Sequence, residues 1–261
     1  MITPFLLMSL IAIAADPVAP LFTESFDDAK LEARDWYDLT TTRIAAGAKA
    51  GKACIEYEWV DGKSTAQGSS PMRRLFEPTD RVYLRYYLKL SKGWGWSRHS
   101  YHPHLTHFMT TENGKWDGPA ASHLTTYTEP VGGRLRLALQ DIQNKDAPHG
   151  LTQGPLKGGY NAQTYDSKEV LFDDEWHLVE AYFQLNTLDL AADKPNRDGI
   201  VRGWLDGKLV VEATDVVLRS TDFPNMKFNQ FLMAPYFGPG LLPHPQKLWI
   251  DELAVGTERP K

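Results

Sequence analysis

Short alternating segments, each closed by turn residues, are the feature of this sequence that most restricts its fold. From Leu21 onward apolar and polar side chains alternate in short runs, and Gly, Pro, Asp or Asn separates one run from the next. This rhythm is typical of a sandwich or jelly roll, and no long helical period competes with it. The sequence therefore predicts an all-β fold, an antiparallel β-sandwich. The expected strands are residues 21–26, 53–60, 72–78, 82–90, 105–111, 123–128, 134–142, 176–185, 201–205, 208–212, 228–237 and 247–255.

Three segments are expected to depart from this rhythm. Residues 27–38 are predicted to hold one helical turn, and residues 185–199 read as an excursion before a hairpin that turns at Asp206-Gly207. Residues 145–168 are rich in Gly, Pro, Asn and Gln, so they are expected to form one long loop. No repeat of fixed period and no Pro/Ser-rich linker divides the chain, which predicts a single domain over residues 16–261.

The N-terminus carries the pattern of a signal peptide. Residues 5–14 form an apolar run that is too short to span a bilayer, and Ala12 and Ala14 give an A-x-A-like cleavage site. We therefore expect residues 1–15 to be removed and the mature protein to be secreted or periplasmic. No later segment approaches transmembrane length, so no membrane contact is expected after cleavage.

Charge and cysteine content narrow the classes of partner. The chain has 28 basic and 33 acidic residues, mixed along its length without a basic block, so nucleic acid is not an expected partner. Cys54 is the only cysteine, which rules out an intrachain disulfide. Aromatic residues make up 11% of the chain, and sugar rings stack on such side chains. The expected partner is a polysaccharide or oligosaccharide bound by a monomeric protein.

Four phrases of the sequence together resemble a known superfamily. They are RVYLRYYLKLS, DDEWHLVEAYFQLNT, the hairpin RGWLDGKLV and the final LWIDELAVGT. They resemble the concanavalin A-like jelly rolls, and among these the secreted polysaccharide lyases of the alginate-lyase and glucuronan-lyase type. The resemblance implies a jelly-roll fold and lyase activity on a uronate-containing polysaccharide. Some alginate lyases carry a basic, Gly-rich segment after the first of these phrases, where this chain has HPHLTHF.

Lyases of this kind work by β-elimination, and this reaction determines which residue types a catalytic site needs. One group must neutralise the uronate carboxylate, a base must remove the neighbouring proton, and an acid must protonate the leaving oxygen. Strand alternation places Arg136 and Gln140 on one face of residues 134–142, opposite three leucines. It likewise aligns His123 with Tyr127, and Arg85 with Tyr87. Arg85, Arg136 and Gln140 are thus candidates for carboxylate neutralisation, Tyr127 with His104 or His107 for proton transfer, and Tyr87 and His123 for further substrate contacts.

The histidine-rich segment allows more than one interpretation. His104 and His107 differ in parity, so at most one of them can face a groove if the strand is regular. A rival hypothesis is a zinc site formed by His102, His104 and His107, although their spacing matches no zinc motif. No cofactor is required for the elimination. Related jelly rolls often hold a structural calcium between the first and last strands, where Glu24, Asp27 and Asp251 would supply oxygen ligands.

Two other carbohydrate functions are alternatives to the lyase hypothesis. A retaining glycosidase on this fold carries the strand motif Glu-x-Asp-x-x-Glu, which is absent from the sequence. A non-catalytic, lectin-like domain remains the alternative, because exposed aromatic rings would give it surfaces on which sugars stack. The rings it would use are those of Trp94, Trp96, Trp116 and Tyr236.

Overall fold

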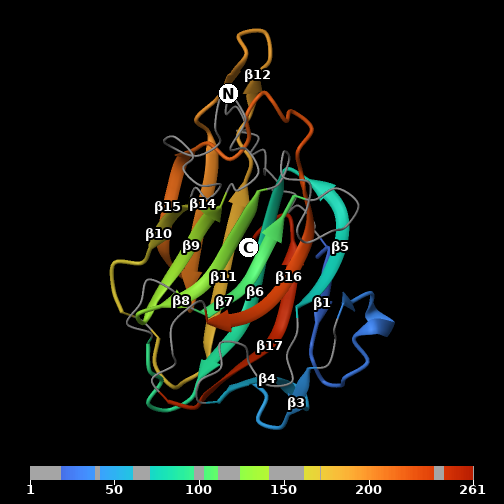
Figure 1. Cartoon of the computed structure of the whole chain (residues 1–261), viewed down its shortest axis with the longest axis vertical. Coiled ribbons are helices and arrows are strands. Elements are labelled where there is room, and N and C mark those ends of the chain that lie inside the picture. Colours follow the sequence, from blue (N-terminus) through green and yellow to red (C-terminus); the bar gives the residue numbers. More distant parts are fainter. Residues whose placement is uncertain are drawn as a thin grey trace, which may run out of the picture.

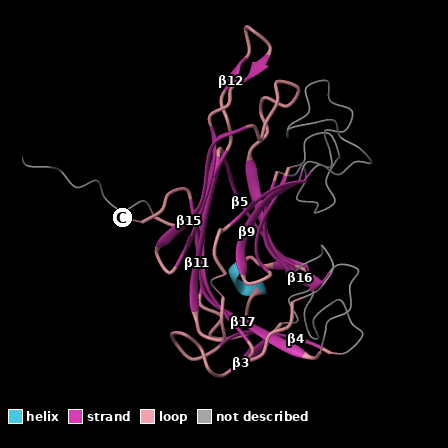
Figure 2. Ribbon diagram, turned by 90° about the vertical axis from the view of Figure 1, so that its left-hand side faces the viewer, coloured by secondary structure: helices cyan, strands magenta, loops and turns pink. Residues whose placement is uncertain are grey.

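Alternating side chains assemble the strands into two antiparallel sheets that lie face to face (Figure 2). The computed structural model of the chain describes residues 19–38, 42–60, 71–96, 103–110, 124–140, 162–170, 172–237 and 244–260. Within these ranges no helix has the length and hydrophobicity needed to cross a bilayer. The predicted all-β sandwich is confirmed, and the predicted signal peptide lies outside the described residues.

The first sheet, which we call sheet A, pairs strands from both ends of the chain (Figure 1). Near its middle, the long strand β6 lies between β11 and β17. In spatial order its strands are β15 (Lys208–Val216), β14 (Gly199–Leu205), β11 (His177–Gln184), β6 (Arg81–Leu90), β17 (Gln246–Gly256), β4 (Cys54–Trp59) and β3 (Arg43–Ala45), while β1 (Phe22–Glu24) also pairs with β17.

The second sheet, sheet B, contains the strand with His104 and His107 and the next strands along the chain. Its strands bend, as Figure 2 shows for β9, β16 and β5. In spatial order they are β10 (Ala162–Asp166), β9 (Arg134–Gln140), β8 (Thr125–Val131), β7 (Pro103–Met109), β16 (Phe228–Phe237), β5 (Met72–Thr79) and β2 (Tyr37–Asp38). A separate two-stranded arm, β12 (Leu188–Asp189) with β13 (Lys194–Pro195), extends from one end of the sandwich (Figure 1).

The core fills the space between the two sheets and follows the predicted alternation. On β9, Leu135, Leu137 and Leu139 are fully buried, whereas the intervening Arg136 is partly exposed. The inward residues of β6 alternate in the same way with its outward residues. Because one face of each sheet is buried, the polar residues that alternate with the core residues lie on the outer faces of the sandwich.

Two predicted irregular segments contain more structure than the sequence indicated. Residues 162–166, expected to belong to one long loop, form β10, which pairs along its whole length with β9. The excursion at residues 185–199 contains the arm formed by β12 and β13. The expected helical turn is confirmed as the short 3-10 helix η1 (Glu32–Arg34).

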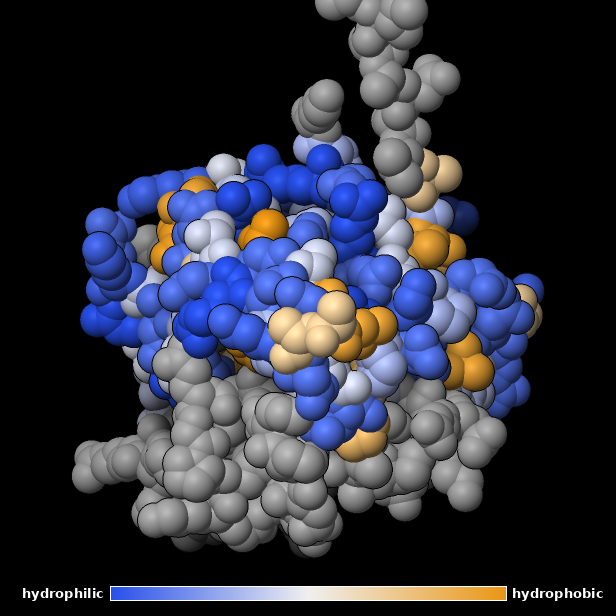
Figure 3. Space-filling view, turned by 90° about the horizontal axis from the view of Figure 1, so that it is seen from above, coloured by the Kyte–Doolittle hydropathy of each residue, from blue (hydrophilic) through white to orange (hydrophobic). Residues whose placement is uncertain are grey.

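Most aromatic residues are used inside the sandwich. Phe108 packs against Phe231 at 5.4 Å between ring centroids, and Trp36 packs edge-on against Phe22 at 5.8 Å. In contrast, the end-on view of Figure 3 is mainly hydrophilic with small separate apolar areas. Core packing therefore accounts for much of the aromatic content of the chain.

Candidate functional site

The candidate site lies on the outer face of sheet B, across β7, β8 and β9. Tyr127, Arg136 and Gln140 lie on the outward parity of their strands, opposite the buried leucines of β9. Backbone pairing sets Tyr127 beside His107 on one side and beside Ala138 on the other. The structure thus brings Tyr127, Arg136 and Gln140 to one surface.

Both candidate histidines lie against the same tyrosine. The ring centroid of His104 is 4.9 Å from that of Tyr127, and the ring centroid of His107 is 4.6 Å from it. The two imidazoles stack on each other at 6.1 Å. His107 is buried, and the side chain of His104 is 13% exposed. Two imidazoles and a phenol therefore form one contact group, which we call the His–Tyr cluster.

The expectation that only one histidine can share this face fails because β7 is not regular. Leu105 and Phe108 are both buried in the core although their positions have opposite parity, so the alternation shifts between them. The pairing of β7 with β16 also shifts register here. From Met233 to Tyr236 strand β16 advances three residues, while β7 covers only two, from Thr106 to His104. This local irregularity turns His104 to the same side as His107.

Hydrogen bonds hold two members of the site in place. The hydroxyl of Tyr127 donates to Oε1 of Gln140. Nδ1 of His107 lies 3.3 Å from the carbonyl oxygen of Leu232 on β16. A carbonyl only accepts, so this contact places the proton of neutral His107 on Nδ1 and leaves the lone pair on Nε2.

Arg136 is tied to a neighbouring carboxylate. Its Nε lies 2.6 Å from Oδ1 of Asp166 on β10, and its Nη2 lies 2.8 Å from Oδ2, which is a bidentate ion pair. The hydrogen bonds to Asp166 raise the pKa of Arg136 above its ordinary value, so the guanidinium stays charged. Asp166 therefore offsets much of the positive charge that Arg136 would offer to a uronate.

Two residues of this surface were missed by sequence reasoning. Glu129 is fully buried, and its Oε2 lies 3.3 Å from Nδ1 of His104. It follows Tyr127 by two positions on β8, so strand parity alone would have placed it on the same face. Asp166 was assigned to a loop, and only its pairing with β9 reveals that it lies beside Arg136.

Arg85 and Tyr87 do not lie on this face, which corrects the prediction that Arg85 binds the substrate carboxylate together with Arg136 and Gln140 and that Tyr87 adds a further substrate contact there. Both residues lie on β6 in sheet A, where Arg85 pairs with Glu180 of β11. They point outward on the opposite side of the sandwich, and Lys49 lies over the ring of Tyr87 at 5.3 Å. The predicted contact His123 lies outside the described residues.

The carboxylates predicted for calcium have other partners. Glu24 accepts hydrogen bonds from Arg34 and Trp36, and Asp251 accepts from the backbone of Lys49 and Ala50. Asp27 also accepts from backbone N–H groups. In the described part of the chain, no group of three or more His, Cys, Asp or Glu residues gathers as a metal site. The structural calcium stays a prediction. His102 of the zinc hypothesis lies outside the described residues.

Two of the four aromatic residues considered for sugar stacking pack into the sandwich instead. Trp94 and Trp96 contact each other at 6.0 Å and lie against the core, and Trp94 also packs edge-on against buried Trp59. Trp116 and the side chain of Tyr236 lie outside the described residues. Trp94 and Trp96 of the lectin-like alternative thus pack against the core.

Several solved structures with a similar fold are polysaccharide lyases. Alginate lyase vAL-1 from Chlorella virus superposes with a TM-score of 0.67 at 13% identity, covering 92% of this chain and 100% of that chain. A double mutant of alginate lyase Aly36B in complex with alginate trisaccharide gives 0.60 at 15% identity, covering 92% and 95%. The endo-β-1,4-glucuronan lyase from the fungus Trichoderma reesei gives 0.58 at 15% identity, covering 92% and 96%.

These similarities are structural only. No protein-family model matches the sequence, and no curated protein matches it. The chain shares its jelly-roll fold with alginate and glucuronan lyases.

Proposed function

We propose that this protein is a secreted polysaccharide lyase that cleaves an acidic, uronate-containing polysaccharide by β-elimination on the outer face of sheet B. The observation that carries the proposal is the His–Tyr cluster, in which two imidazoles contact one phenol. Such groups serve as acid and base because their protonation responds to their surroundings near neutral pH. The fold shared with alginate and glucuronan lyases adds support for the substrate class.

The elimination assigns a task to each group. A base of the cluster takes the proton from C5 of the uronate, next to the carboxylate. The electron pair of the broken C–H bond forms the C4=C5 double bond, and the C4–O bond breaks. The leaving glycosidic oxygen receives a proton from an acid of the cluster. We assign these transfers to Tyr127 with His107 or His104.

Carboxylate neutralisation falls mainly to Gln140 in this proposal. Its Oε1 is held by the Tyr127 hydroxyl, so the amide N–H groups on the other side are donors for a uronate carboxylate. Arg136 contributes less, because its Nε and Nη2 already bind the carboxylate of Asp166. Arg85 has no part in the site, because it lies on sheet A.

The experiment is a panel of polysaccharides followed by ultraviolet absorbance. Alginate, polyglucuronate and polygalacturonate are incubated with the protein, and a neutral β-glucan serves as the control. Elimination creates a double bond conjugated to the carboxylate, so absorbance should rise with at least one uronate polymer and not with the glucan. A flat trace on every uronate polymer, despite binding, would favour the non-catalytic carbohydrate-binding alternative.

A further inference from the structure

Glu129 is a buried carboxylate beside the His–Tyr cluster, and the proposed elimination gives it no task. It is fully buried on β8, and its Oε2 lies 3.3 Å from Nδ1 of His104. Its cross-strand neighbour on β9 is Arg136, whose electrostatic environment includes the Glu129 charge. Burial of a carboxylate costs free energy unless cationic or hydrogen-bonding partners compensate it. The imidazole of His104, 3.3 Å away, and the positive charge of Arg136 are the groups that compensate the charge of Glu129.

The contact with Glu129 determines which nitrogen of His104 carries the proton. An ionised carboxylate only accepts hydrogen bonds, so the imidazole nitrogen that faces it must be the donor. In neutral His104 the proton then sits on Nδ1 and the lone pair on Nε2. The same argument applies to His107, whose Nδ1 faces the carbonyl of Leu232. The two imidazoles are thus held in the same tautomer by two different acceptors.

We infer that Glu129 is a positioning residue that holds His104 in the Nδ1–H tautomer and orients its ring against Tyr127. Nε2 of His104 is then the nitrogen that exchanges a proton with the reacting groups. The effect of Glu129 on catalysis rests on the proposed lyase function. The 3.3 Å contact between Nδ1 and Oε2 and the tautomer of His104 are properties of the folded protein and do not depend on any substrate.

Two substitutions separate the acceptor from the charge. Glu129→Gln keeps a side-chain oxygen that accepts from Nδ1, whereas Glu129→Met has similar length and offers only a weak acceptor. Glu180→Gln is a matched control, because Glu180 is also a buried carboxylate but is paired with Tyr83 and Arg259 on sheet A. It removes the same charge from a buried position on the other side of the sandwich.

The test reads the tautomer of His104 from the nitrogen NMR spectrum of its imidazole, assigned by comparison with the His104→Gln protein. Wild type, E129Q and E180Q are expected to show the Nδ1–H form, and E129M a shift toward the Nε2–H form. On a uronate polymer that wild type cleaves, E129M should lower kcat by roughly tenfold or more with KM changed less than about twofold. E129Q should recover part of the loss.

The outcomes distinguish this inference from the proposed function. An Nε2–H tautomer in wild type overturns the inference without any variant, so it remains falsifiable even if E129M does not fold. An unchanged tautomer or an unchanged kcat in folded E129M also overturns it. If wild type cleaves no uronate polymer, the proposed function fails, and the tautomers of His104 in wild type and in E129M decide whether Glu129 positions His104.

Discussion

At the scale of single residues, Tyr127 is the group on which the proposed elimination most depends. Its ring contacts both histidines and its hydroxyl donates to Gln140. Tyr127→Phe removes the phenolic proton with little change in shape, so turnover should fall by roughly a hundredfold or more. The measurement is kcat from the absorbance rise on a uronate polymer.

Tyr182 provides a matched control for this substitution. Its hydroxyl also donates to a glutamine, Gln184, but on the outer face of sheet A. Tyr182→Phe should leave kcat within about twofold while it costs about 1 kcal/mol of stability for the lost hydrogen bond. Equal losses in both variants would show that the effect of Y127F is structural.

The Arg136–Asp166 pair makes a second prediction at this scale. Asp166→Asn removes the negative charge that offsets Arg136 and leaves the guanidinium in place. Binding of an acidic polysaccharide should tighten severalfold at low ionic strength, and the gain should shrink as salt screens the charges. Affinity measured by titration calorimetry at two salt concentrations checks this.

The control for D166N is Glu212→Gln, which changes net charge by the same amount. Glu212 forms a comparable ion pair with Arg202 at 2.8 Å, but between β14 and β15 of sheet A. We expect E212Q to leave the affinity unchanged. If E212Q tightens binding as much as D166N, the gain comes from net charge, and the outer face of sheet B is not the binding surface.

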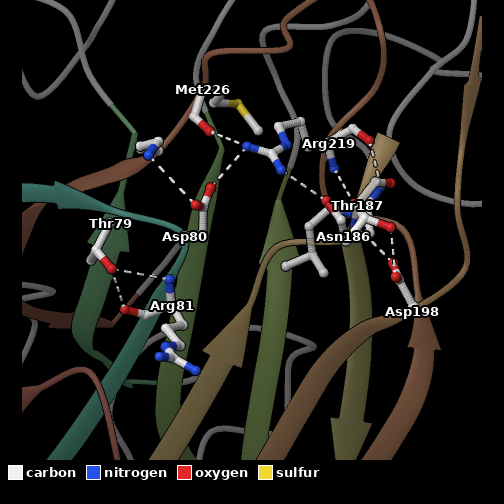
Figure 4. A network of polar contacts seen from close by, with 10 residues as sticks. Thr79, Asp80, Arg81, Asn186, Thr187, Asp198, Arg219 and Met226 are labelled. Atoms are coloured by element: carbon white, nitrogen blue, oxygen red, sulfur yellow. Dashed lines mark hydrogen bonds and ion pairs between the residues drawn. The ribbon is translucent and has the colours of Figure 1, made fainter. Parts of the chain in front are cut away.

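At the scale of elements, a polar network fixes the connections at one end of the sandwich (Figure 4). Asn186 is fully buried after β11, and its Oδ1 accepts from the backbone N–H groups of Leu218 and Arg219, each at 2.8 Å. Arg219 in turn reaches Asp80, between β5 and β6, at 2.9 Å. The connections around residues 80, 186 and 219, which are distant in sequence, are therefore joined through the side chains of Asn186, Arg219 and Asp80.

Truncation of Asn186 should be costly for this reason. Asn186→Ala leaves buried backbone donors without their acceptor, so the free energy of unfolding should fall by on the order of 3 kcal/mol. Asn196→Ala is the control, because exposed Asn196 donates one side-chain hydrogen bond to Thr187, and its loss should cost less than about 0.5 kcal/mol. Urea denaturation of both variants measures the difference.

His177 joins two other connections in a way that depends on pH. Its Nδ1 lies 2.7 Å from Asp206 in the β14–β15 turn, and its Nε2 lies 2.9 Å from Asp173 before β11. Burial lowers the pKa of His177, but the two carboxylates outweigh it, and the net pKa is raised. A raised pKa means that the stabilisation is complete below the unfolded value of about 6.5 and disappears as pH rises through the folded value.

The destabilisation caused by His177→Gln should follow the same profile. It should be about 1 kcal/mol near pH 5.5, because both carboxylates are half exposed and solvent weakens the pairs, and it should shrink toward pH 8. The Asp173 end of the pair weakens only in stronger acid, because backbone and His177 hydrogen bonds lower the pKa of Asp173. A deficit that grows from pH 5.5 to pH 8 would contradict this assignment.

At the scale of the whole molecule, local patterns predicted strand faces but not sheet membership. Leu137 and Arg136 were placed on the correct faces, because alternation is a property of a few consecutive residues. Arg85 alternates just as clearly, yet β6 pairs with β11 and β17, which come much later in the chain. Only these non-local pairings decide that Arg85 belongs to the sheet opposite Tyr127.

The candidate site likewise contains residues that local patterns predict and residues that only non-local pairing brings there. Gln140 and Tyr127 were predicted from their own strands, whereas His104 reaches the cluster only through the irregularity between β7 and β16. That irregularity depends on how two distant strands fit together, and parity along one strand cannot reveal it. Asp166 was missed because a short edge strand in a Gly-rich segment has little pattern of its own.

In the proposed function, this sandwich breaks a uronate polymer by elimination at the His–Tyr cluster. The most direct test is the mass spectrum of the oligosaccharides released from polyglucuronate and alginate by the wild-type protein and by Y127F. Elimination adds no water, so we predict products lighter by one water molecule than the corresponding hydrolysis products, formed at least about a hundredfold more slowly by Y127F. Products with the mass of hydrolysis, or equal rates for the two proteins, would contradict the account.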